Sequence, residues 1–442
     1  MPEPTRSVLR FIIPSLIGVL FFLTPIVVDG KTTILIGYLV NLIDAWLGPA
    51  LDIMIGALFF TSAILALLYS NVSSLSARAH PLVNKYFNTT WPWITFRVVG
   101  GIFAPLTALS LGPEWMISED TGQVALEIGG IILLIMFLAN FLLPLLVDFG
   151  FLEYIGTLLT RLFQKIFRLP GRAALDSITS WVGDSSVGAL LTIRQYDQGS
   201  YTAREAAVVV TNFSAVSLPF TVIVTEIANI EVGFVTFYGI VIFIGLVAAF
   251  ITPRLPPLSR IPDTYAIANP PGQPPIEGNL FKVAWERAMD RAANAPGIKT
   301  ILRRGTESTL DIYFAVLPAA MAIEFMALVV YAYSDVFYWL SYPMLPFLYL
   351  FGISSPEAVL PGTLVGFFDQ FVPAILAGEL TDAKARFVLA GLSVTQLIFI
   401  AENGALILRS NIPINLPQLF SVFVIRTLIA LPVLSLAAHW LH

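Results

Sequence analysis

Four acidic side chains occur within stretches of sequence that are otherwise apolar. They are Asp184, Glu324, Asp369 and Glu402. If these stretches lie in a membrane, each carboxylate at the bilayer centre costs on the order of 2.5–3.5 kcal/mol, so it must be partnered, protonated or in contact with water. We expect Glu324 and Glu402, with Asn403 and Thr211 beside them, to carry protons or bind a cation. Buried hydrogen-bonded pairing of the carboxylates is the alternative.

Two of these acids begin stretches that repeat each other, at residues 184–217 and 369–396. The matches before the connecting loop are Asp184, Val187, Ala189 and Leu191 with Asp369, Val372, Ala374 and Leu376. Those after it are Thr202, Ala206, Val209 and Ser214 with Thr381, Ala385, Val388 and Ser393, where the numbering offset falls from 185 to 179 because the second loop is six residues shorter. A membrane protein with two such copies is most simply a transporter that binds its substrate between them.

Composition places the chain in a membrane. Its 442 residues are 57% hydrophobic and 12% charged, with a mean hydropathy of +0.82, far from the makeup of soluble domains. Hydropathy predicts nine spans, near 10–28, 49–69, 94–111, 124–150, 202–227, 232–253, 309–333, 381–408 and 416–440. Residues 254–306 hold eight Lys and Arg, so the positive-inside rule puts this segment and the N-terminus in the cytoplasm. We therefore predict a multi-pass protein of the bacterial inner membrane.

Several functional classes find no support in the residues. The chain has no cysteine and only three histidines, which argues against disulfides, iron–sulfur clusters, haem and catalytic zinc. The motifs His-Glu-x-x-His and Gly-x-Ser-x-Gly are both missing, so we predict that the protein is not an enzyme. No cofactor is expected apart from a coupling Na⁺ or H⁺, and nucleic acid is not an expected partner.

Two segments, 171–193 and 356–378, are apolar enough to enter the membrane but too short to cross it twice. Two arms of about 10–12 residues reach ~15–18 Å each, about half of the hydrocarbon thickness. We predict re-entrant helical hairpins that follow interfacial helices at 152–168 and 335–352. Each unit then runs span, interfacial helix, hairpin, span, span, and its three crossings invert the second copy.

The predicted fold class is an all-α polytopic membrane protein, with about nine transmembrane helices and two re-entrant hairpins in an inverted repeat. Four regions divide it: N-terminal membrane helices at 1–123, the first repeat at 124–253, a cytoplasmic linker at 254–306 and the second repeat at 307–442. The linker carries eight prolines within 253–275 and then an amphipathic helix at 279–295.

The hairpin tips are the first candidate binding groups. They carry Asp184, Ser185 and Ser186 in one copy and Asp369 and Gln370 in the other. At a tip the second arm exposes backbone N–H groups that lipid cannot satisfy, so Asp and Ser are expected there as N-caps. The same helix N-terminus attracts an anionic group, and a fixed carboxylate can hold a cation or a substrate amine. Both roles are open.

The spans that follow the hairpins supply the second group. Asn212, Ser214, Ser217, Ser393 and Gln396 are the candidates that read a small polar solute. Small polar residues in membrane helices also pack helices together, at about 0.6 kcal/mol each, which is the alternative for any one of them.

Three segments carry a family resemblance: Leu-Pro-Gly-Arg-Ala-Ala-Leu-Asp-Ser at 169–177, Trp-Val-Gly-Asp-Ser-Ser-Val-Gly at 181–188, and residues 201–217. They resemble the YjiH family, which carries the nucleoside-recognition Gate domain. The resemblance covers roughly 1–250 well and the second half more loosely, through its repeat. The Gate domain is similar to that of concentrative nucleoside transporters, whose two hairpins and facing broken spans bind substrate and a coupling sodium.

By that resemblance, Asp184–Ser186 and Asn212–Ser217 form one half of a substrate site. The other half is formed by Asp369, Gln370, Ser393 and Gln396. The hairpins lack the Gln–Thr–Glu run that nucleoside carriers use on ribose and base, which separates this chain from them in specificity. The ferrous-iron Gate proteins carry a GTPase with a Gly-x-x-x-x-Gly-Lys-Ser/Thr loop, and this chain has none.

The resulting hypothesis is a secondary active transporter that moves a small polar organic solute across the inner membrane by alternating access, coupled to Na⁺ or H⁺. An amino-acid-like solute, a dipeptide and a nucleoside are the candidate substrates. A non-transporting membrane scaffold or subunit of an envelope complex is the alternative. The residues do not fix the solute, the ion, the direction of transport or the oligomeric state, and a homo-oligomer stays open.

Overall fold

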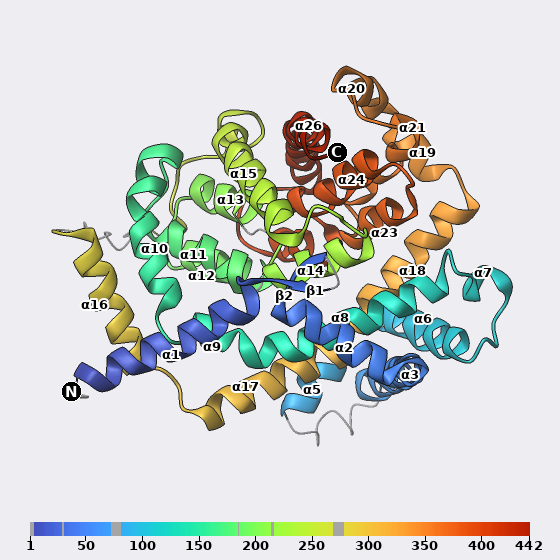
Figure 1. Ribbon diagram of the computed structural model, residues 1–442, viewed down its shortest axis with the longest axis horizontal. Coiled ribbons are helices and arrows are strands. Elements are labelled where there is room, and N and C mark those ends of the chain that lie inside the picture. Colours follow the sequence, from blue (N-terminus) through green and yellow to red (C-terminus); the bar gives the residue numbers. More distant parts are fainter. Residues whose placement is uncertain (1–3, 29–30, 72–80, 184, 214–215, 268–277) are drawn as a thin grey trace. The chain divides into compact units, whose positions relative to one another are not determined.

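The computed structural model describes residues 4–28, 31–71, 81–183, 185–213, 216–267 and 278–442. The chain divides into two compact units, and each is considered by itself (Figure 1). Unit 1 comprises Met1–Leu35, Leu142–Pro296 and Leu340–His442, and unit 2 comprises Ile36–Phe141 and Gly297–Trp339.

Unit 2 is built from helices of high apolar content. Its elements are α2 (Leu35–Leu47), α3 (Pro49–Asn71), α5 (Pro81–Phe87), α6 (Trp91–Ala108), α7 (Glu114–Ile117), α8 (Gly122–Leu142), α17 (Ile298–Asp311), the π-helical turn η5 (Ile312–Val316) and α18 (Leu317–Tyr333). Glycine allows α3 and α6 to approach closely, since a Cβ on Gly56 would lie 2.9 Å from the Cα of Pro105. Such small-residue contacts are the usual way in which membrane helices associate.

Unit 1 holds both copies of the repeat. Its N-terminal and first-repeat elements are α1 (Pro4–Phe22), β1 (Pro25–Val28), β2 (Lys31–Ile34), α9 (Pro144–Val147), α10 (Phe151–Leu162), η1 (Phe163–Phe167), α11 (Arg172–Ile178), η2 (Thr179–Gly183), α12 (Ser185–Asp197), α13 (Ala203–Asn212), α14 (Leu218–Ile227) and α15 (Phe234–Ile251). The linker contributes η3 (Thr252–Arg254), η4 (Leu258–Arg260) and α16 (Leu280–Ala293).

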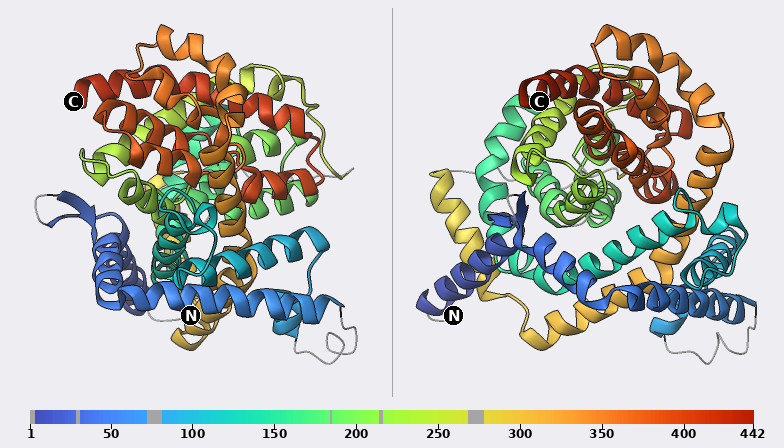
Figure 2. Two further views of the ribbon diagram at one scale, coloured as in Figure 1. Left: turned by 90° about the vertical axis from the view of Figure 1, so that its right-hand side faces the viewer. Right: turned by 45° about the vertical axis from the view of Figure 1, so that its right-hand side comes forward.

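The second copy in unit 1 follows a short helix, α19 (Val336–Ser341), that runs from unit 2. Its elements are η6 (Tyr342–Met344), α20 (Leu345–Leu350), α21 (Pro356–Val359), α22 (Gly362–Val365), α23 (Phe371–Glu379), α24 (Ala383–Thr395), η7 (Ile400–Gly404), α25 (Ala405–Arg409) and α26 (Leu416–Leu441). Helix α24 packs against α23 and α26, and the two further views show the dark red C-terminal helix beside the orange-red helices of this copy (Figure 2).

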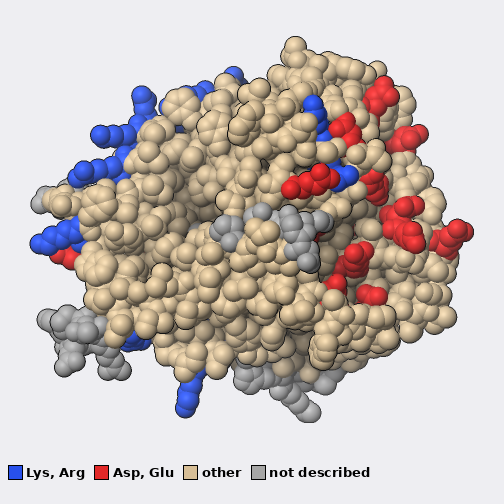
Figure 3. All heavy atoms as spheres, in the orientation of Figure 1, with Lys and Arg blue, Asp and Glu red and all other residues tan. Residues whose placement is uncertain are grey.

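Five helical segments are long and apolar enough to cross a membrane, among the described residues. They are Pro49–Asn71, Glu114–Val147, Phe234–Arg254, Ile298–Tyr333 and Leu416–Leu441. Wide surface without charged side chains covers much of the face drawn in Figure 3. The protein is therefore a multi-pass membrane protein, whereas the count of nine spans stays a prediction.

The other four predicted spans are shorter or interrupted. Helix α6 is a continuous helix of 18 residues, and helix α1 ends at Phe22. The stretch 202–227 contains two helices, α13 and α14, and the stretch 381–408 contains α24, the π-helical turn η7 and α25, with residues 396–399 non-helical between α24 and η7. A hydropathy average does not detect such breaks, because the intervening residues are as apolar as the helices.

A short β-hairpin departs from the all-α prediction. Strands β1 and β2 pair antiparallel, with Pro25 opposite Ile34 and Val28 opposite Lys31. The β-branched run Ile26–Val28 favours strand over helix, and the Asp-Gly sequence that follows it is typical of tight hairpins. In the apolar run predicted as a span at 10–28, the helix therefore ends six residues early, at Phe22.

The first hairpin segment forms two antiparallel helical arms. One arm is α11 with η2, and the other is α12. Near the tip, a Cβ on Gly188 would lie 2.5 Å from the Cβ of Ser180, so the Ser180 side chain packs against the backbone of the other arm. At the base, Gln195 Nε2 donates to the Asp176 carboxylate at 2.8 and 3.0 Å. This segment thus contains two helical arms that contact each other, and the re-entrant hairpin at 171–193 stays a prediction.

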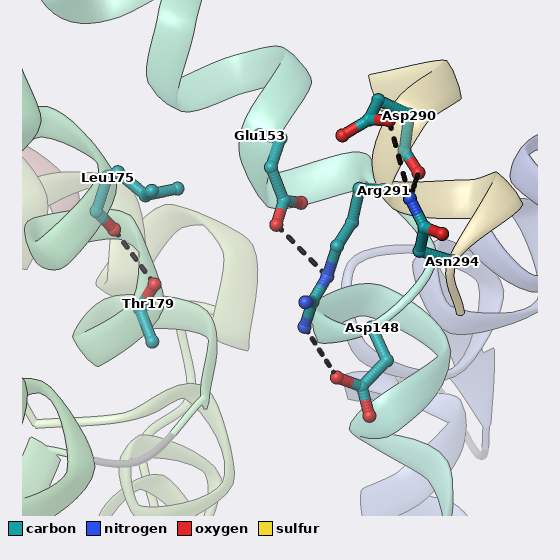
Figure 4. A network of polar contacts seen from close by, with 7 residues as sticks. All are labelled: Asp148, Glu153, Leu175, Thr179, Asp290, Arg291 and Asn294. Carbon is teal, nitrogen blue, oxygen red and sulfur yellow. Dashed lines mark hydrogen bonds and ion pairs between the residues drawn. The ribbon is translucent and has the colours of Figure 1, made fainter. Parts of the chain in front are cut away.

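Ion pairs of Arg291 and hydrogen bonds of Arg10, together called the brace, hold the linker helix α16 against its neighbours in unit 1. The Arg291 guanidinium lies between two carboxylates, 2.8 Å from Asp148 Oδ1 and 3.2 Å from Glu153 Oε1 (Figure 4). Arg10 donates to the carbonyls of Ala293 and Ala295, at the C-terminal end of α16. Helix α16 packs on α10, and α10 packs on the hairpin arm α11, so the brace reaches the hairpin in two steps.

Candidate functional site

The first candidate region is the break between α13 and α14. Helix α13 begins with a capping box, in which Thr202 accepts from the Glu205 N–H at 3.2 Å and Glu205 accepts from the Thr202 N–H at 2.9 Å. It ends at Asn212, and α14 starts after Ser217 with Pro219 in its first turn. A proline there cannot continue an incoming helix, so the chain breaks in the middle of the stretch predicted as a span.

Asn212 is buried at the end of α13, with 1% of its surface exposed. Its Oδ1 accepts a hydrogen bond from Thr252 Oγ1 at 2.5 Å and another from Arg426 Nη1 at 2.8 Å. Its Nδ2 donates to Val208 O at 3.2 Å and to Thr211 Oγ1 at 3.0 Å. The amide is therefore held in one orientation, with its oxygen directed at Arg426.

The second candidate region is the break after α24. Helix α24 ends at Thr395, and Leu397 has φ +62°. This left-handed conformation is rare for a branched side chain and costs about 1–3 kcal/mol, and such strain clusters at functional sites. The Ile400 N–H donates out of the helix to Phe367 O, in the hairpin segment, at 2.8 Å. The break thus joins the broken span to the hairpin.

Arg426 connects the two breaks. Its Nε lies 3.2 Å from Thr395 O and 3.1 Å from Gln396 O, and its Nη2 lies 2.7 Å from Thr395 O. Its Nη1 donates to Asn212 Oδ1 across the repeats. The side chain is 1% exposed, and each hydrogen-bond partner of the guanidinium within the described chain is an uncharged oxygen. Arg426 lies ten residues into α26, about 15 Å along a span of ~30 Å.

Arg426 is a functional candidate that the sequence analysis missed. The signal was present, because it is an arginine in the middle of the predicted span 416–440. The candidates were acidic and polar residues, whereas a charge of either sign within a span, Arg426 included, is a functional-site hypothesis by default.

The second hairpin places its predicted tip residues in defined contacts. Asp369 Oδ1 accepts from the N–H of Phe371, the first residue of α23, at 2.7 Å. Asp369 therefore does serve as a cap, as one of its two predicted roles requires, and the ligand role stays a prediction. The Gln370 carbonyl accepts from Ser393 Oγ at 2.6 Å, which ties the tip to α24.

Gln396 lies between the second hairpin and α26. Its Nε2 donates to Thr363 O at 2.7 Å and to Thr427 Oγ1 at 2.9 Å. Its Oε1 is buried and has no hydrogen-bond partner in the part of the chain that the structure describes. The same holds for Gln370 Oε1 and for both side-chain polar atoms of Asn403. Buried polar atoms normally have partners, so these are atoms that a water, ion or solute would satisfy.

The remaining predicted residues have mixed outcomes. Ser217 is buried just before α14. Asp184 and Ser214 lie outside the described residues, as do the side chains of Ser185, Ser186 and Glu402, although Ser185 and Ser186 begin α12 and Glu402 lies in η7. Thr211 donates to Ala207 O at 2.7 Å within its own helix.

Glu324 is the one predicted residue that belongs to unit 2. It is fully buried in α18, whereas the other predicted site residues that are described lie in unit 1. Its role in proton carriage stays a prediction.

A small cavity lies at the junction of the two breaks, with room for about one water molecule. Asn212, Thr395 and Arg426 contribute its polar lining, with Trp181 of the first hairpin and Tyr238 of α15. Valine, isoleucine and leucine side chains supply most of the rest. Broken helices, hairpins and a buried charge around one cavity define a class of multi-pass membrane proteins with an internal polar site.

Comparison with known proteins makes the assignment more specific. Residues 125–231 match the Gate family model, which is described as nucleoside recognition. A protein of Alkalihalophilus pseudofirmus, named only as uncharacterized, is 37% identical over 439 residues, which cover 98% of this chain and 95% of that protein. The chain belongs to the same family as this protein. The Gate assignment made from the sequence is confirmed, and the name YjiH stays a prediction.

One solved structure matches almost the whole length of the chain. It is a doubly substituted CNTnw, a concentrative nucleoside transporter, in an outward-facing state. The match covers 99% of this chain and 97% of that one, with 12% identity and a TM-score of 0.35.

Proposed function

We propose that the protein is a secondary active transporter, which moves a small polar organic solute across the inner membrane by alternating access. The observation that supports this most is the pair of broken helices, one from each copy of the repeat, whose ends are joined through Asn212 and Arg426. Irregular backbone is tolerated inside a membrane only where protein buries it or where it lines a cavity. Discontinuous helices at a repeat interface are the common form of a transporter site.

The buried polar atoms without partners favour transport over the alternative of a membrane scaffold. A scaffold gains nothing from Gln370 Oε1, Gln396 Oε1 and the Asn403 amide, because each costs free energy when left unsatisfied. A carrier needs such atoms, since they must exchange partners when the solute enters and leaves.

Coupling to Na⁺ or H⁺ is proposed to involve Glu402 and Asn403 in η7, with Thr211 near the first break. Backbone carbonyls freed by helix breaks coordinate cations in other transporters. Glu324 in unit 2 is the second candidate for proton carriage.

The direct test is uptake by the purified protein in proteoliposomes, with nucleosides, amino acids and dipeptides as solutes. We expect Asp184→Asn and Asp369→Asn to abolish uptake while folded protein stays in the membrane. Asp335→Asn, at an exposed residue outside both predicted hairpins and both broken helices, is the matched control and should retain uptake. Wild-type uptake by both tip variants would remove the role proposed for the acidic tips, and absence of uptake of every solute by the wild type would support the scaffold.

A further inference from the structure

We infer that Arg426 is the anchor for an oxyanion group, a carboxylate or a phosphate, of the transported solute. This inference rests on the proposed transport function and makes its substrate class more specific. None of the residues predicted from the sequence supplies such an anchor, because the predicted set contains acids, amides and hydroxyls only.

The first argument is the hydrogen-bonding capacity of the guanidinium. Arginine carries five N–H groups in a fixed planar fork. The Nε–H is shared between the carbonyls of Thr395 and Gln396, one N–H of Nη2 goes to Thr395 O, and one N–H of Nη1 goes to Asn212 Oδ1. One N–H on each terminal nitrogen is left over among the described contacts. A guanidinium that keeps one N–H on each terminal nitrogen has the donors to hold a carboxylate or phosphate by two hydrogen bonds.

The second argument is charge. A buried charge in a protein is normally paired with an opposite charge. The contacts of Arg426 are two carbonyls at the C-terminal end of α24 and one amide oxygen. A helix C-terminus carries only about half an elementary negative charge. Within the described residues no carboxylate lies in ion-pair distance of the guanidinium, and a bound oxyanion would supply the missing charge.

The third argument is the chemistry of the cavity wall. Trp181 Nε1 is buried and donates to no acceptor in the described structure, and Trp181 lines the same cavity as Arg426. The Asn212 oxygen already accepts two hydrogen bonds. The cavity wall therefore offers a ligand the Trp181 indole N–H and the positive charge of Arg426, beside the hydroxyls of Tyr238 and Thr395. A solute group that accepts hydrogen bonds and bears negative charge fits this wall, and an ammonium group does not.

A competing role for Arg426 is purely structural, as a permanent cap on the broken end of α24. Lys, Arg and His side chains do bond the last carbonyls of helices. The two roles differ in one respect: a cap makes the affinity for solute independent of the solute's charge, whereas an anchor makes the affinity depend on it.

The experiment compares matched pairs of probes that differ in one charged group. The pairs are succinamate with succinamide, alanyl-alanine with alanyl-alaninamide, and uridine 5′-monophosphate with uridine. Thermal stabilisation of the purified wild type and uptake in proteoliposomes are measured for each member at constant ionic strength. We expect at least one charged member to stabilise the protein and to be taken up, and its neutral partner to bind at least about 100-fold more weakly. The carboxylate and phosphate pairs separate the two sources of an oxyanion.

Variants test the residue itself. Arg426→Gln should reduce the preference for the charged member at least about 100-fold, and Arg426→Lys, which keeps the charge without the fork, should give an intermediate result. Arg97→Gln is the matched control, since Arg97 is a buried arginine of unit 2 that donates to Tyr86 O at 2.7 Å. It should leave the preference unchanged.

The wild-type comparison decides the matter even if Arg426→Gln does not fold. Equal binding of charged and neutral members, or uptake confined to neutral members, would overturn the anchor and leave the transporter standing. A preference that persists in folded Arg426→Gln would do the same. Absence of both binding and uptake for every probe would reject the transport function together with the anchor.

Discussion

At the scale of single residues, Asp369 combines a local role with a proposed functional one. Its carboxylate accepts the Phe371 N–H at the start of α23. Asparagine can accept the same bond, so Asp369→Asn should keep the stability of the hairpin and lose uptake. Asp369→Ala should lose uptake and also about 1 kcal/mol of stability. Thermal unfolding of both variants beside the uptake assay separates the two roles, and unchanged uptake in folded Asp369→Asn would leave only the cap.

Glu402 is the residue through which coupling can be tested. Glu402→Gln keeps the size of the side chain and removes its proton and charge. We expect the pH or sodium dependence of uptake to change, since a coupling group must gain and lose its cation in each cycle. The measurement is uptake against pH and against sodium. A variant with the wild-type profile in both would move the coupling role to another carboxylate, and Glu324→Gln would be the next to measure.

Residue types predicted much of the candidate site. The amides and hydroxyls of Asn212, Ser393 and Gln396 are buried at or next to the two helix breaks, and their polar type and their clustering in the spans after the hairpins had made them candidates. Arg426 could not be given its partners from sequence, because its bonds to Asn212 and Thr395 span 214 and 31 residues. Contacts of that range depend on packing, which spacing does not encode.

At the scale of elements, the contact between α16 and the turn before α10 is tight enough to test. Gly150 has φ +100°, and a Cβ there would lie 2.5 Å from the backbone oxygen of Ala288. Gly150→Ala should therefore lower stability by about 1–3 kcal/mol, since both the conformation and the contact oppose a side chain. The control is Gly239→Ala in α15, where nothing lies within 4 Å. It should be neutral or gain up to about 1 kcal/mol.

The buried carboxyl of Glu153, which pairs with Arg291, makes the stability of the fold depend on pH. Burial raises the pKa of the Glu153 carboxyl above its ordinary 4.5, a hydrogen bond and Arg291 oppose this in part, and Asp148 adds to it. Because the folded-state pKa is raised, this contribution to stability is fully present below pH 4.5 and is lost as the pH rises through the folded-state pKa. Glu153→Gln should remove that loss. Thermal midpoints of wild type and variant, measured upward from pH 4.5, would show parallel curves if Glu153 does not contribute.

Elements were predicted unevenly, for a physical reason. The amphipathic helix expected at 279–295 is α16, because a face of small residues needs a partner and α10 supplies one. The breaks at 213–217 and 396–399 were not visible as interruptions, since both are composed largely of apolar residues. The β-hairpin at 25–34 was missed because a hydropathy window scores β-branched residues as span.

At the scale of the whole molecule, the predicted orientation can be measured directly, because the natural chain has no cysteine. Single cysteines can therefore be introduced without removing any others. Glu119→Cys should react with an impermeant thiol reagent added outside intact cells, and Arg287→Cys in α16 should react only after the membrane is opened. Both positions are exposed in the structure. The reverse labelling pattern would invert the topology, and with it the assignment of 254–306 to the cytoplasm.

The bond between Arg426 and Asn212 constrains how such a protein can move. If one copy of the repeat rocked against the other, the 2.8 Å contact would open, and a guanidinium would be stranded in an apolar interior at every cycle. We expect the ends of both broken helices, with α26, to travel as a single body instead. A crosslink between these two helix ends should then leave uptake intact. A crosslink from either end to a helix that does not move with this body should abolish uptake.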